Sequence, residues 1–532
     1  MAINLSEFIL RQAGQSSEKI AVIFKKEEMT YGALGADVMA FGQGLIACGM
    51  AKNDRVASYL PKQFETVTAL FGPACAGGVF VPVNPGLKAR QVAYILKDCN
   101  VRFLVTSADR LTALKEYLVD CPDLELIILT GKMPGNDHNM AKKLISYDDF
   151  LAQGRACDRG CDKPVHNVID ADMAAILYTS GSTGMPKGVI LSHRNMIAGA
   201  DSVAGYLGNT SEDKILSVLP LSFDAGLSQL TTAFSVGACI VLMDFLMPRD
   251  VIRQAVKHKI TGITCVPPLW VQLVDLDWPE EAVKSLRYIA TTGGRMPVPV
   301  TRKFRKILPE SDIYLMYGLT EAFRSTYLPP SEVDRIPSSM GKAIPNAEIL
   351  VVREDGTSCD VGEEGELVHR GALVGLGYWN DTARTNERYK PAPGQVAGLP
   401  NPEIAVWSGD WVKKDADGYL YFVGRRDEMI KTSGFRTSPT ELEEIIYASG
   451  LVDEIAAIGI DHDQLGQAIW IVASAKDTAN LDVEGIMAYC RAEMPSYMVP
   501  HKVIEWKILP KNANGKVDRK AITAELKKAE EA

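Results

Sequence analysis

Residues 176–195 read ILYTSGSTGMPKGVILSHRN, the most informative stretch of the chain. The apolar run Ala174–Leu177 predicts a buried strand. Directly after it, residues 179–188 hold three glycines, four hydroxyl side chains and Lys187. Such a loop can wrap a polyphosphate, because glycines let backbone N–H groups converge, hydroxyls add donors and the lysine supplies a cation. The stretch therefore predicts a phosphate-binding turn at the end of a buried strand.

Two other interpretations of this loop are weaker. The loop lacks the G-x-x-x-x-G-K-[ST] frame, which disfavours a P-loop NTPase. A flexible Gly/Ser linker is the other alternative. A linker is not expected to follow a buried strand directly, nor to contain the Pro-Lys-Gly turn of residues 186–188.

On both sides of the loop, apolar runs alternate with helical patterns, which is the rhythm of α/β structure. The first 150 residues combine short strands, RVASYL and VRFLVTS, with amphipathic helices around Val38–Cys48 and Gln91–Asp98. The alternation continues through ILSVLP, ACIVLMD, TGITCVPP and LRYIATTGG. We expect a large N-terminal domain built from doubly wound α/β subdomains.

Near residue 345 the pattern changes to extended segments separated by Gly and Asp-Gly turns, which predicts a small β subdomain. These segments are NAEILVVREDG, GELVHRGALVGLGYW and DGYLYFVGRRDE. Two helical and three strand patterns follow them, and they predict a compact α+β C-terminal domain of about a hundred residues.

The composition excludes several classes of protein. The 532 residues are 47% hydrophobic and 23% charged, which is usual for globular proteins large enough for two cores. Lys and Arg number 57 against 66 Asp and Glu, and the net charge of −9 gives no electrostatic footprint for nucleic acid. The first residues lack the uncharged segment of a secretory signal, and no run resembles a membrane span, so we expect a cytoplasmic protein.

The cysteines do not indicate disulfides or a metal site. Ten cysteines are too dilute for a disulfide framework. Cys157 and Cys161 lie close together with His166 nearby, but paired C-x2-C knuckles are absent. A solvated loop is therefore favoured there over a metal site.

The phosphate-binding loop belongs to a set of five ordered motifs. YTSGSTGMPKG (178–188) resembles the signature of the superfamily of AMP-forming acyl-CoA synthetases, nonribosomal-peptide adenylation domains and luciferases. Four later motifs are similar to signatures of that superfamily: YGLTE (317–321), WSGD (407–410), GRRDEMIKTSGFR (424–436) and NANGKVDRK (512–520). More narrowly, MYGLTEAFRSTYLPP and GRRDEMIKTSGFRTSPTE resemble acyl-CoA ligases associated with bacterial exosortase A gene clusters. The resemblance covers nearly the whole chain.

The resemblance implies an ATP-dependent, AMP-forming acid–thiol ligase. The carboxylate of the substrate attacks the α-phosphate of ATP, which releases pyrophosphate and leaves an acyl-adenylate. Fixed donors and cations stabilise the charge that develops on the α-phosphate in the transition state. The acyl group then passes to a pantetheine thiol of coenzyme A or of a carrier protein. ATP, Mg²⁺ and that thiol are the expected cofactors.

The resemblance also implies the phosphate and metal site. The glycine-rich loop would hold the β- and γ-phosphates, and Glu321 with Thr320 and Thr179 would position Mg²⁺, a cation that prefers oxygen ligands. The expected catalytic residues are Lys187, Glu321 and Lys516. The expected ATP- and AMP-binding residues are Thr179, Ser180, Gly181, Ser182, Thr183, Gly184, Lys187, Gly293, Gly294, Tyr317, Gly318, Thr320, Asp410, Arg425 and Lys516.

Within this set, Asp410 would accept hydrogen bonds from both ribose hydroxyls, a task that suits the lone pairs of a carboxylate. Arg425 would assist there. Tyr317 would stack on adenine, with Gly293 and Gly294 letting the backbone approach the ring. The alternatives are an ordinary turn aspartate for Asp410 and a core aromatic for Tyr317.

Lys516 is the lysine that the family brings from its C-terminal domain to bridge the substrate carboxylate and the nucleotide. Without the motif, it would be one lysine among many on an acidic domain. The family places its hinge at Asp427, which implies an adenylation core over residues 1–426 and a mobile lid over residues 427–532. After adenylation the lid would rotate and remove Lys516 from the site.

The same rotation would bring a different surface of the lid to the active site. Lys431, Ser433 and Gly434 would then line a thiol tunnel, with Gly434 letting a pantetheine arm pass close to the backbone.

The acid pocket departs from the common fatty acyl pattern. Where simple acyl-CoA synthetases often carry Pro-Leu-Phe-His, residues 220–226 read PLSFDAG, and Phe223-Asp224 resembles the Phe-Asp pair of amino-acid-activating domains. A buried carboxylate is costly unless a cation meets it, so we hypothesise a substrate with an amine near its carboxylate. The alternative is that Asp224 caps the following helix. The other expected pocket residues are Cys265, Trp270, Met316, Arg324 and Ser325.

Several further alternatives stay open. Arg324 would suit a polar or acidic tail of the substrate, or it would be a salt-bridged structural residue. The sequence shows no basic patch for the nucleotide of coenzyme A, which slightly favours a carrier protein as acceptor. An adenylate-only ligase of the same fold and an inactive adenylate-binding regulator are the competing functions.

Overall fold

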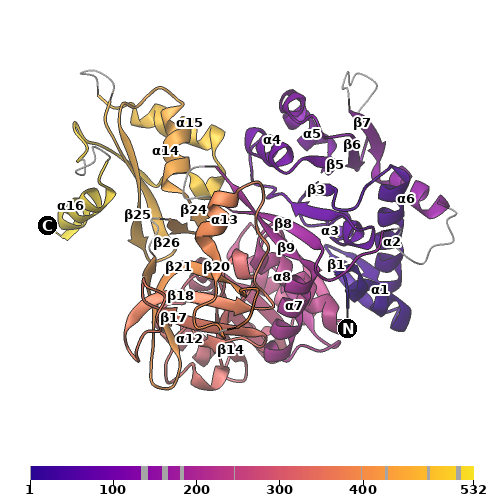
Figure 1. The fold of residues 1–532 in the computed structure, drawn as a ribbon, viewed down its shortest axis with the longest axis horizontal. Helices are drawn as coiled ribbons and strands as arrows, with labels where there is room; N and C mark the ends of the chain where they lie inside the picture. Colours follow the sequence, from indigo (N-terminus) through magenta and orange to yellow (C-terminus); the bar gives the residue numbers. More distant parts are fainter. Residues whose placement is uncertain are drawn as a thin grey trace.

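The computed structural model describes residues 2–133, 142–157, 166–179, 185–244, 246–396, 398–425, 429–475, 480–510 and 517–531. In Figure 1 the C-terminal helix lies at the opposite end of the molecule from the first helices. Among these residues, no helix is both long enough and apolar enough to span a bilayer.

An eight-stranded sheet carries the glycine-rich loop. Its strands, in spatial order, are β19 (Gly377–Tyr378), β9 (Lys187–Ser192), β8 (Met173–Thr179), β4 (Val79–Pro82), β3 (Arg55–Tyr59), β5 (Val101–Ser107), β6 (Leu126–Thr130) and β7 (Lys143–Ser146). The strands from β8 to β7 are parallel, whereas β9 and β19 are antiparallel to their neighbours. One face is covered by α4 (Ala89–Asp98) and α5 (Ala108–Leu114), and the other by α2 (Tyr31–Ala47), α3 (Phe64–Cys75) and α6 (Tyr147–Ala156).

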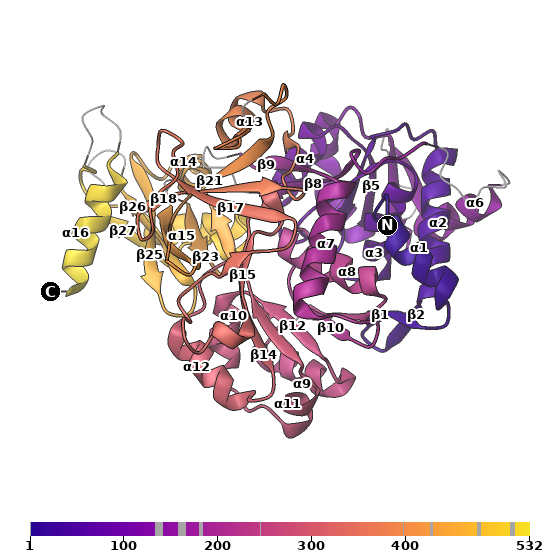
Figure 2. The ribbon, with the colours of Figure 1, turned by 60° about the horizontal axis from the view of Figure 1, so that its bottom comes forward.

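A nine-stranded sheet forms the second half of the N-terminal part. Its order is β16 (Lys342–Ala343), β15 (Thr326–Leu328), β14 (Asp312–Tyr317), β13 (Tyr288–Thr291), β12 (Gly262–Cys265), β10 (Lys214–Ser217), β11 (Cys239–Leu242), β1 (Ile20–Phe24) and β2 (Glu27–Thr30). The strands from β14 to β1 are parallel. The outer face packs against α9 (Pro248–His258), α10 (Pro267–Leu273), α11 (Glu280–Ser285) and α12 (Val298–Ile307), which are grouped together in Figure 2.

One hydrophobic core joins the two sheets. It combines buried residues of both sheets with α1 (Ser6–Gln15), α2, α3, α7 (His193–Leu207) and α8 (Asp224–Val236). Because parallel strands buried on both faces need apolar side chains throughout, this layering explains the continuous β-branched runs in the sequence. The predicted doubly wound α/β architecture is confirmed.

Lys62 connects the carboxyl ends of the two sheets. It follows β3 and is 4% exposed, and its ammonium donates to the carbonyls of Ser217 (2.8 Å), Val218 (2.7 Å) and Met243 (2.8 Å). Burial lowers the pKa of Lys62 to about 8. All three ammonium hydrogens are thus used to hold the ends of β10 and β11, which border the candidate site.

A smaller sheet follows, as predicted for the region after residue 345. Its strands are β17 (Ala347–Val352), β18 (Glu364–Gly371), β21 (Ile404–Lys414) and β20 (Tyr389–Pro391), with β22 (Leu420–Arg425) paired to β21. The helix α13 (Thr382–Arg388) precedes β20. The segment expected to extend through GALVGLGYW does not stay in this sheet, because its end, β19, pairs with β9 instead.

The C-terminal part has its own sheet and two cores. The strands are β24 (Phe435–Thr437), β23 (Ile430–Thr432), β26 (Gly466–Ala473) and β25 (Ile455–His462), with β27 (Lys502–Glu505) beside β26. Alternate residues of β25 and β26 face α14 (Pro439–Tyr447) and α15 (Val483–Glu493) on one side and α16 (Arg519–Glu531) on the other. The two helices and three strands predicted for this region are present, and α16 and the short strands β23 and β24 are additional.

Sheet membership changes between β22 and β23. Asp427, the predicted hinge, lies between these strands and outside the described residues. The boundary between residues 1–426 and 427–532 therefore stays a prediction.

Buried His193 makes the stability of this fold dependent on pH. Its Nδ1 accepts the N–H of Leu5 at 3.3 Å, and burial lowers its pKa to about 4. Since the unfolded chain binds this proton near pH 6.5 and the folded chain does not, stability is lost as pH falls from 6.5 toward 4. The His193→Asn variant keeps a hydrogen-bond acceptor but cannot titrate. We expect its free energy of unfolding to fall by about 2–3 kcal/mol less than that of the parent over this pH range.

Denaturant unfolding at pH 7 and pH 4.5 measures this difference, and exposed His462→Asn serves as the matched control. An unchanged pH slope in His193→Asn contradicts the prediction.

Candidate active site

Two contiguous cavities lie where the two large sheets meet the C-terminal part. The smaller has a volume of about 120 Å³ and the larger about 400 Å³. Residues that line both are Phe223, Asp224, Gly293, Gly318, Gly434 and Phe435. Most motifs singled out in the sequence therefore contribute to one continuous space.

The β8–β9 hairpin supplies one wall of the smaller cavity. Thr179 and Lys187 pair across the hairpin at the base of the glycine-rich loop, and both line the cavity. Thr179 Oγ1 is buried and has no hydrogen-bond partner in the described part of the chain. An unsatisfied buried hydroxyl at this position fits a phosphate or metal ligand. The loop residues Ser180, Gly181, Ser182, Thr183 and Gly184 lie outside the described residues.

Lys187, Glu321 and Tyr378 form a largely buried cluster that lies near Thr179. The Tyr378 hydroxyl donates to Glu321 Oε1 at 2.6 Å, and Lys187 Nζ lies 2.8 Å from that hydroxyl and 3.2 Å from Oε1. The ammonium also lies 4.1 Å from the centre of the Tyr378 ring. Burial and the charge of Glu321 raise the pKa of Tyr378, so its hydroxyl stays protonated and can donate. The cluster holds one cation and one carboxylate at fixed positions in the cavity.

Tyr378 was not predicted as a site residue. It lies in β19, which reaches Lys187 through the antiparallel pairing of Tyr378 with Val189 in β9. The only sequence signal was the extended segment that ends in GYW, and nothing in that segment indicates which strand it joins.

Asp410 and Tyr317 contact each other near the smaller cavity, which is lined by their chain neighbours Ser408 and Gly318 rather than by these two side chains. Asp410 is 1% exposed, and its Oδ2 accepts the Tyr317 hydroxyl at 2.6 Å. Across the β21–β22 pair, Arg425 is the direct register partner of Asp410. Gly409 has φ +70°, and a Cβ there would overlap the guanidinium of Arg388. Tyr317 thus has a hydrogen-bonding contact with the predicted ribose-binding aspartate, in addition to the predicted stacking role.

The larger cavity is mainly apolar, with a few charged groups. Its apolar wall consists of Val218, Leu219, Pro220, Phe223, Ala225, Val266, Leu269, Phe435 and Leu465. Asp224 and Arg324 both line it, and Arg324 Nη1 lies 3.5 Å from Asp224 Oδ2. Asp224 is the first residue of α8, whose N-cap position is Phe223, so Asp224 does not occupy the N-cap position that the alternative interpretation gave it.

Four residues predicted for this pocket do not line it. Cys265 and Trp270 are fully buried in the core under α9–α12, and the neighbour Val266 faces the cavity instead. The side chain alternates direction along β12, which explains this one-residue shift. Ser325 turns away to bond His369 Nδ1 at 2.9 Å. Met316 lies with Arg324 around a separate small cavity of about 20 Å³.

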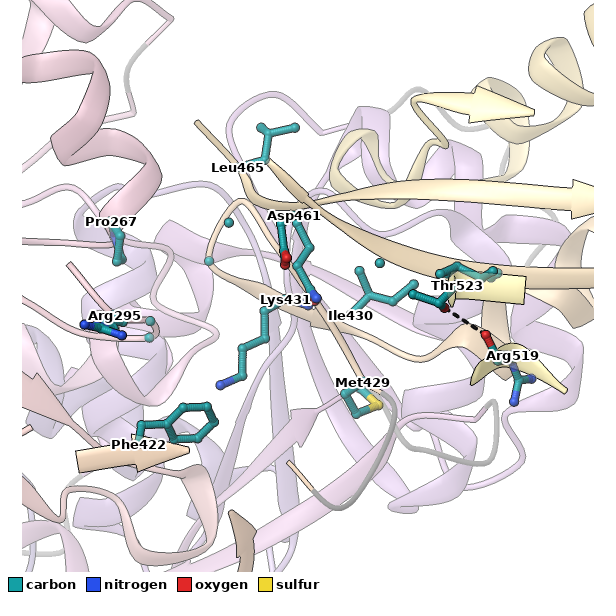
Figure 3. A pocket seen from close by; sticks show the side chains of 18 of the residues that line it. Pro267, Arg295, Phe422, Met429, Ile430, Lys431, Asp461, Leu465, Arg519 and Thr523 are labelled. Atoms are coloured by element: carbon teal, nitrogen blue, oxygen red, sulfur yellow. Dashed lines mark hydrogen bonds between the residues drawn. The ribbon is translucent and has the colours of Figure 1, made fainter. Parts of the chain in front are cut away.

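A third cavity, of about 880 Å³, opens between the N-terminal and C-terminal parts (Figure 3). Gly293, Gly294, Lys431 and Gly434 line it. Gly434 has φ +82°, and a Cβ there would lie 2.7 Å from Val266 Cγ1, so only glycine fits. Neighbouring Phe435 packs edge-on against Phe223, with 4.9 Å between ring centres. The loop containing Ser433 and Gly434 is therefore seated at the candidate site.

Four basic side chains surround this third cavity: Arg295, Lys431, Arg519 and Lys527. Figure 3 shows Arg295 and Phe422 on one side of the cavity and Asp461 and Thr523 on the other. Lys527 pairs with Asp461 at 3.4 Å, and Arg519 with Glu443 at 2.6 Å. The basic lining that the sequence did not reveal comes from three segments that are distant in the sequence, around Arg295, Lys431 and Arg519–Lys527.

Comparison with known proteins identifies the family. Residues 9–379 match the AMP-binding enzyme family, and residues 441–516 match the AMP-binding enzyme C-terminal domain. The chain belongs to the AMP-binding enzyme family. This AMP-binding enzyme is an adenylate-forming ligase, as the motif order predicted.

Individual relatives agree with this assignment. The enzyme is 29% identical to the long-chain-fatty-acid–CoA ligase of Salmonella typhimurium, over 98% of this chain and 95% of the relative. It is 27% identical to tyrocidine synthase 3 of Brevibacillus parabrevis over 97% of its length, but spans only 8% of that protein. A double mutant of o-succinylbenzoate CoA synthetase from Bacillus subtilis has the same fold, with a TM-score of 0.80, 24% identity and 97% of both chains covered.

The donor set of this AMP-binding enzyme fits Mg²⁺ held jointly with nucleotide phosphates. Magnesium usually takes one or two protein oxygens and completes its shell with water and phosphate. Glu321 and the buried hydroxyl of Thr179 line the same cavity and would supply those oxygens. Among the described residues, no group of three or more His, Cys, Asp and Glu side chains forms a separate metal site.

Tyr378→Phe tests the buried cluster. Removing the hydroxyl takes away the hydrogen bond that Tyr378 donates to Glu321 and its contact with Lys187. Because hydrogen bonds to charged groups contribute about 1.5–3 kcal/mol, the rate of ATP–pyrophosphate exchange should fall about ten- to hundredfold. Tyr31→Phe also removes a buried hydroxyl, which donates to Ala238 at 2.7 Å far from the site, and should leave exchange unchanged. Equal exchange in the Tyr378→Phe variant and the parent contradicts the positioning role.

Proposed function

We propose that this AMP-binding enzyme activates a carboxylic acid with ATP and transfers the acyl group to the thiol of coenzyme A. The observation that carries the proposal is the continuity of the two smaller cavities, which joins Thr179, Lys187 and Glu321 to the apolar acid pocket. An acid in the larger cavity would have its carboxylate at the junction of the two cavities, beside Gly293 and Gly318 and next to the wall of Thr179, Lys187 and Glu321.

In the first half-reaction a carboxylate oxygen attacks the α-phosphorus, the bond to the β-phosphate breaks and pyrophosphate leaves. The ammonium of Lys187 neutralises phosphate charge, and Glu321 with Thr179 would hold Mg²⁺, which neutralises further charge when bound. Asp410 accepts ribose hydroxyls, with Tyr317 fixing the carboxylate through its own hydroxyl. Gly293, Gly294 and Thr320 complete the predicted nucleotide contacts.

In the second half-reaction the thiol sulfur attacks the acyl carbonyl, the thiol proton is lost and AMP leaves. In this structure the Gly434 loop packs against Val266, and Phe435 packs against Phe223. These contacts support an arrangement in which the Gly434 loop lines the path of the thiol in this step. Lys516, which lies outside the described residues, is proposed to act in the first step, before the lid rotates about Asp427 and removes it from the site.

The basic lining of the largest cavity favours coenzyme A over a carrier protein. Coenzyme A carries three phosphates on its nucleotide end, whereas a carrier protein presents one phosphate on its pantetheine arm. Arg295, Lys431, Arg519 and Lys527 line a space that shares Gly293 and Gly434 with the active site. Lys527 and Arg519 are paired with Asp461 and Glu443, so the excess of positive charge comes from Arg295 and Lys431. Cations around a concave site attract anionic ligands most strongly where water is partly excluded.

Lys516→Ala tests the reaction order. We expect this variant to lose acid-dependent pyrophosphate exchange by about a hundredfold or more, because the transition-state charge loses a cation, yet to convert a preformed acyl-adenylate to thioester. Exposed Lys507→Ala is the matched control. Equal exchange in Lys516→Ala and parent contradicts the assignment, and exchange without thioester formation in the parent indicates an adenylate-only ligase.

Arg295→Glu tests the acceptor. Charge reversal at this exposed position should raise the KM for coenzyme A about tenfold, because a glutamate there repels the phosphates of the acceptor. Pyrophosphate exchange should not change, because it does not involve those phosphates. The KM for pantetheine, which lacks those phosphates, should not move. Arg302→Glu, on the exposed side of α12, is the control. A preference for a pantetheinylated carrier over coenzyme A contradicts this choice.

A further inference from the structure

An ion pair occupies the wall of the acid pocket. Arg324 is 3% exposed, and its Nη1 lies 3.5 Å from Asp224 Oδ2. The other oxygen of that carboxylate, Oδ1, accepts the N–H of Ala225 at 2.7 Å. Both oxygens of Asp224 therefore have partners within the chain. The cost of a buried unpaired carboxylate, which was the basis for expecting a substrate amine, does not arise here.

The backbone fixes Arg324 in this position. The preceding residue, Phe323, is fully buried at φ +54°, a strained conformation for a bulky side chain. A Cβ added to Gly199 would lie only 2.5 Å from Cδ1 of Phe323, so the Phe323 ring fills the space that a side chain there would need. This packing holds the strained turn, and the turn directs the guanidinium into the pocket. Arg324 Nε is buried without a hydrogen-bond partner among the described residues, so the contact with Asp224 is made through Nη1.

The remaining groups of the pocket do not call for a charged substrate. The three ammonium hydrogens of Lys62 are donated to backbone carbonyls, so Lys62 offers no donor to a ligand. Asp244, 3.9 Å from Lys62, is mostly exposed to solvent. The other side chains named above as the wall are apolar. An ammonium placed at Asp224 would instead lie next to the guanidinium of Arg324, where like charges repel strongly in a partly dehydrated site.

We propose that Arg324 determines substrate specificity by pairing with the Asp224 carboxylate. The enzyme would then select acids with an uncharged, mainly apolar body and reject acids that carry an ammonium group beside the carboxylate. This inference rests on the proposed acid activation and names the class of acid. Specificity here comes from a repulsive element rather than from an added attraction.

Matched pairs of acids test the inference on the unmodified enzyme. The pairs hexanoate and norleucine, and hydrocinnamate and phenylalanine, differ by one amino group. We expect kcat/KM for acid-dependent pyrophosphate exchange to favour the unaminated acid by at least about a hundredfold. A parent enzyme that prefers the aminated acid, or treats both alike, overturns the inference while leaving acid activation intact. No exchange with any acid overturns the proposed function, and this inference with it.

Two variants then separate specificity from structure. Arg324→Gln should narrow the preference at least about tenfold by raising exchange with the aminated acids, while Arg324→Lys, which keeps the charge, should retain it. Adding Asp224→Asn to Arg324→Gln should remove the gained activity. Thermal melting checks that each variant is folded. An equal loss of exchange with both members of a pair means that Arg324 is only structural and overturns the inference.

Discussion

The buried contact between Lys187 and Glu321 joins the two halves of the N-terminal part at the point where chemistry is expected. Lys187 begins β9 of the eight-stranded sheet, and Glu321 follows β14 of the nine-stranded sheet. A buried ion pair is costly to dehydrate and stabilises a structure only when its remaining hydrogen-bonding capacity is met. The Tyr378 hydroxyl meets that need, and it brings β19 to the sheet edge. The positions of the Lys187 and Glu321 charges therefore depend on the pairing of β19 with β9, which brings Tyr378 to them.

The contact between the N-terminal and C-terminal parts is made through small residues and aromatic rings. Gly434 approaches Val266 more closely than any side chain allows, and Phe435 packs against Phe223 on one face and Tyr497 on another. Contacts of this kind suit the rotation that is proposed for the C-terminal part. The seated Ser433–Gly434 loop fits the proposed second half-reaction, in which a thiol reaches the adenylate.

Charges around the cavities are arranged for different tasks. At the wall proposed to bind phosphate, a cation and a carboxylate are held close to a buried hydroxyl. In the proposed acid pocket, Asp224 and Arg324 neutralise each other, and the ammonium of Lys62 donates to backbone carbonyls at the ends of β10 and β11. Around the largest cavity, basic side chains outnumber the acidic ones that line it. Charge paired within the chain excludes a charged ligand, and a charge excess attracts one.

Local patterns in the amino-acid sequence were enough for the α/β class and most strands of the two large sheets, whereas Thr179, Lys187, Glu321 and Asp410 were singled out by the resemblance of their motifs to the signatures of a known family. Periodicity and turn chemistry act over a few residues, so they can be read without the fold. The roles of Tyr378, Lys62 and the Asp224–Arg324 pair could not be read in this way. Each depends on which strand lies beside which, and on which side chain a buried charge meets. Those contacts arise from packing between segments up to two hundred residues apart, where no local preference acts.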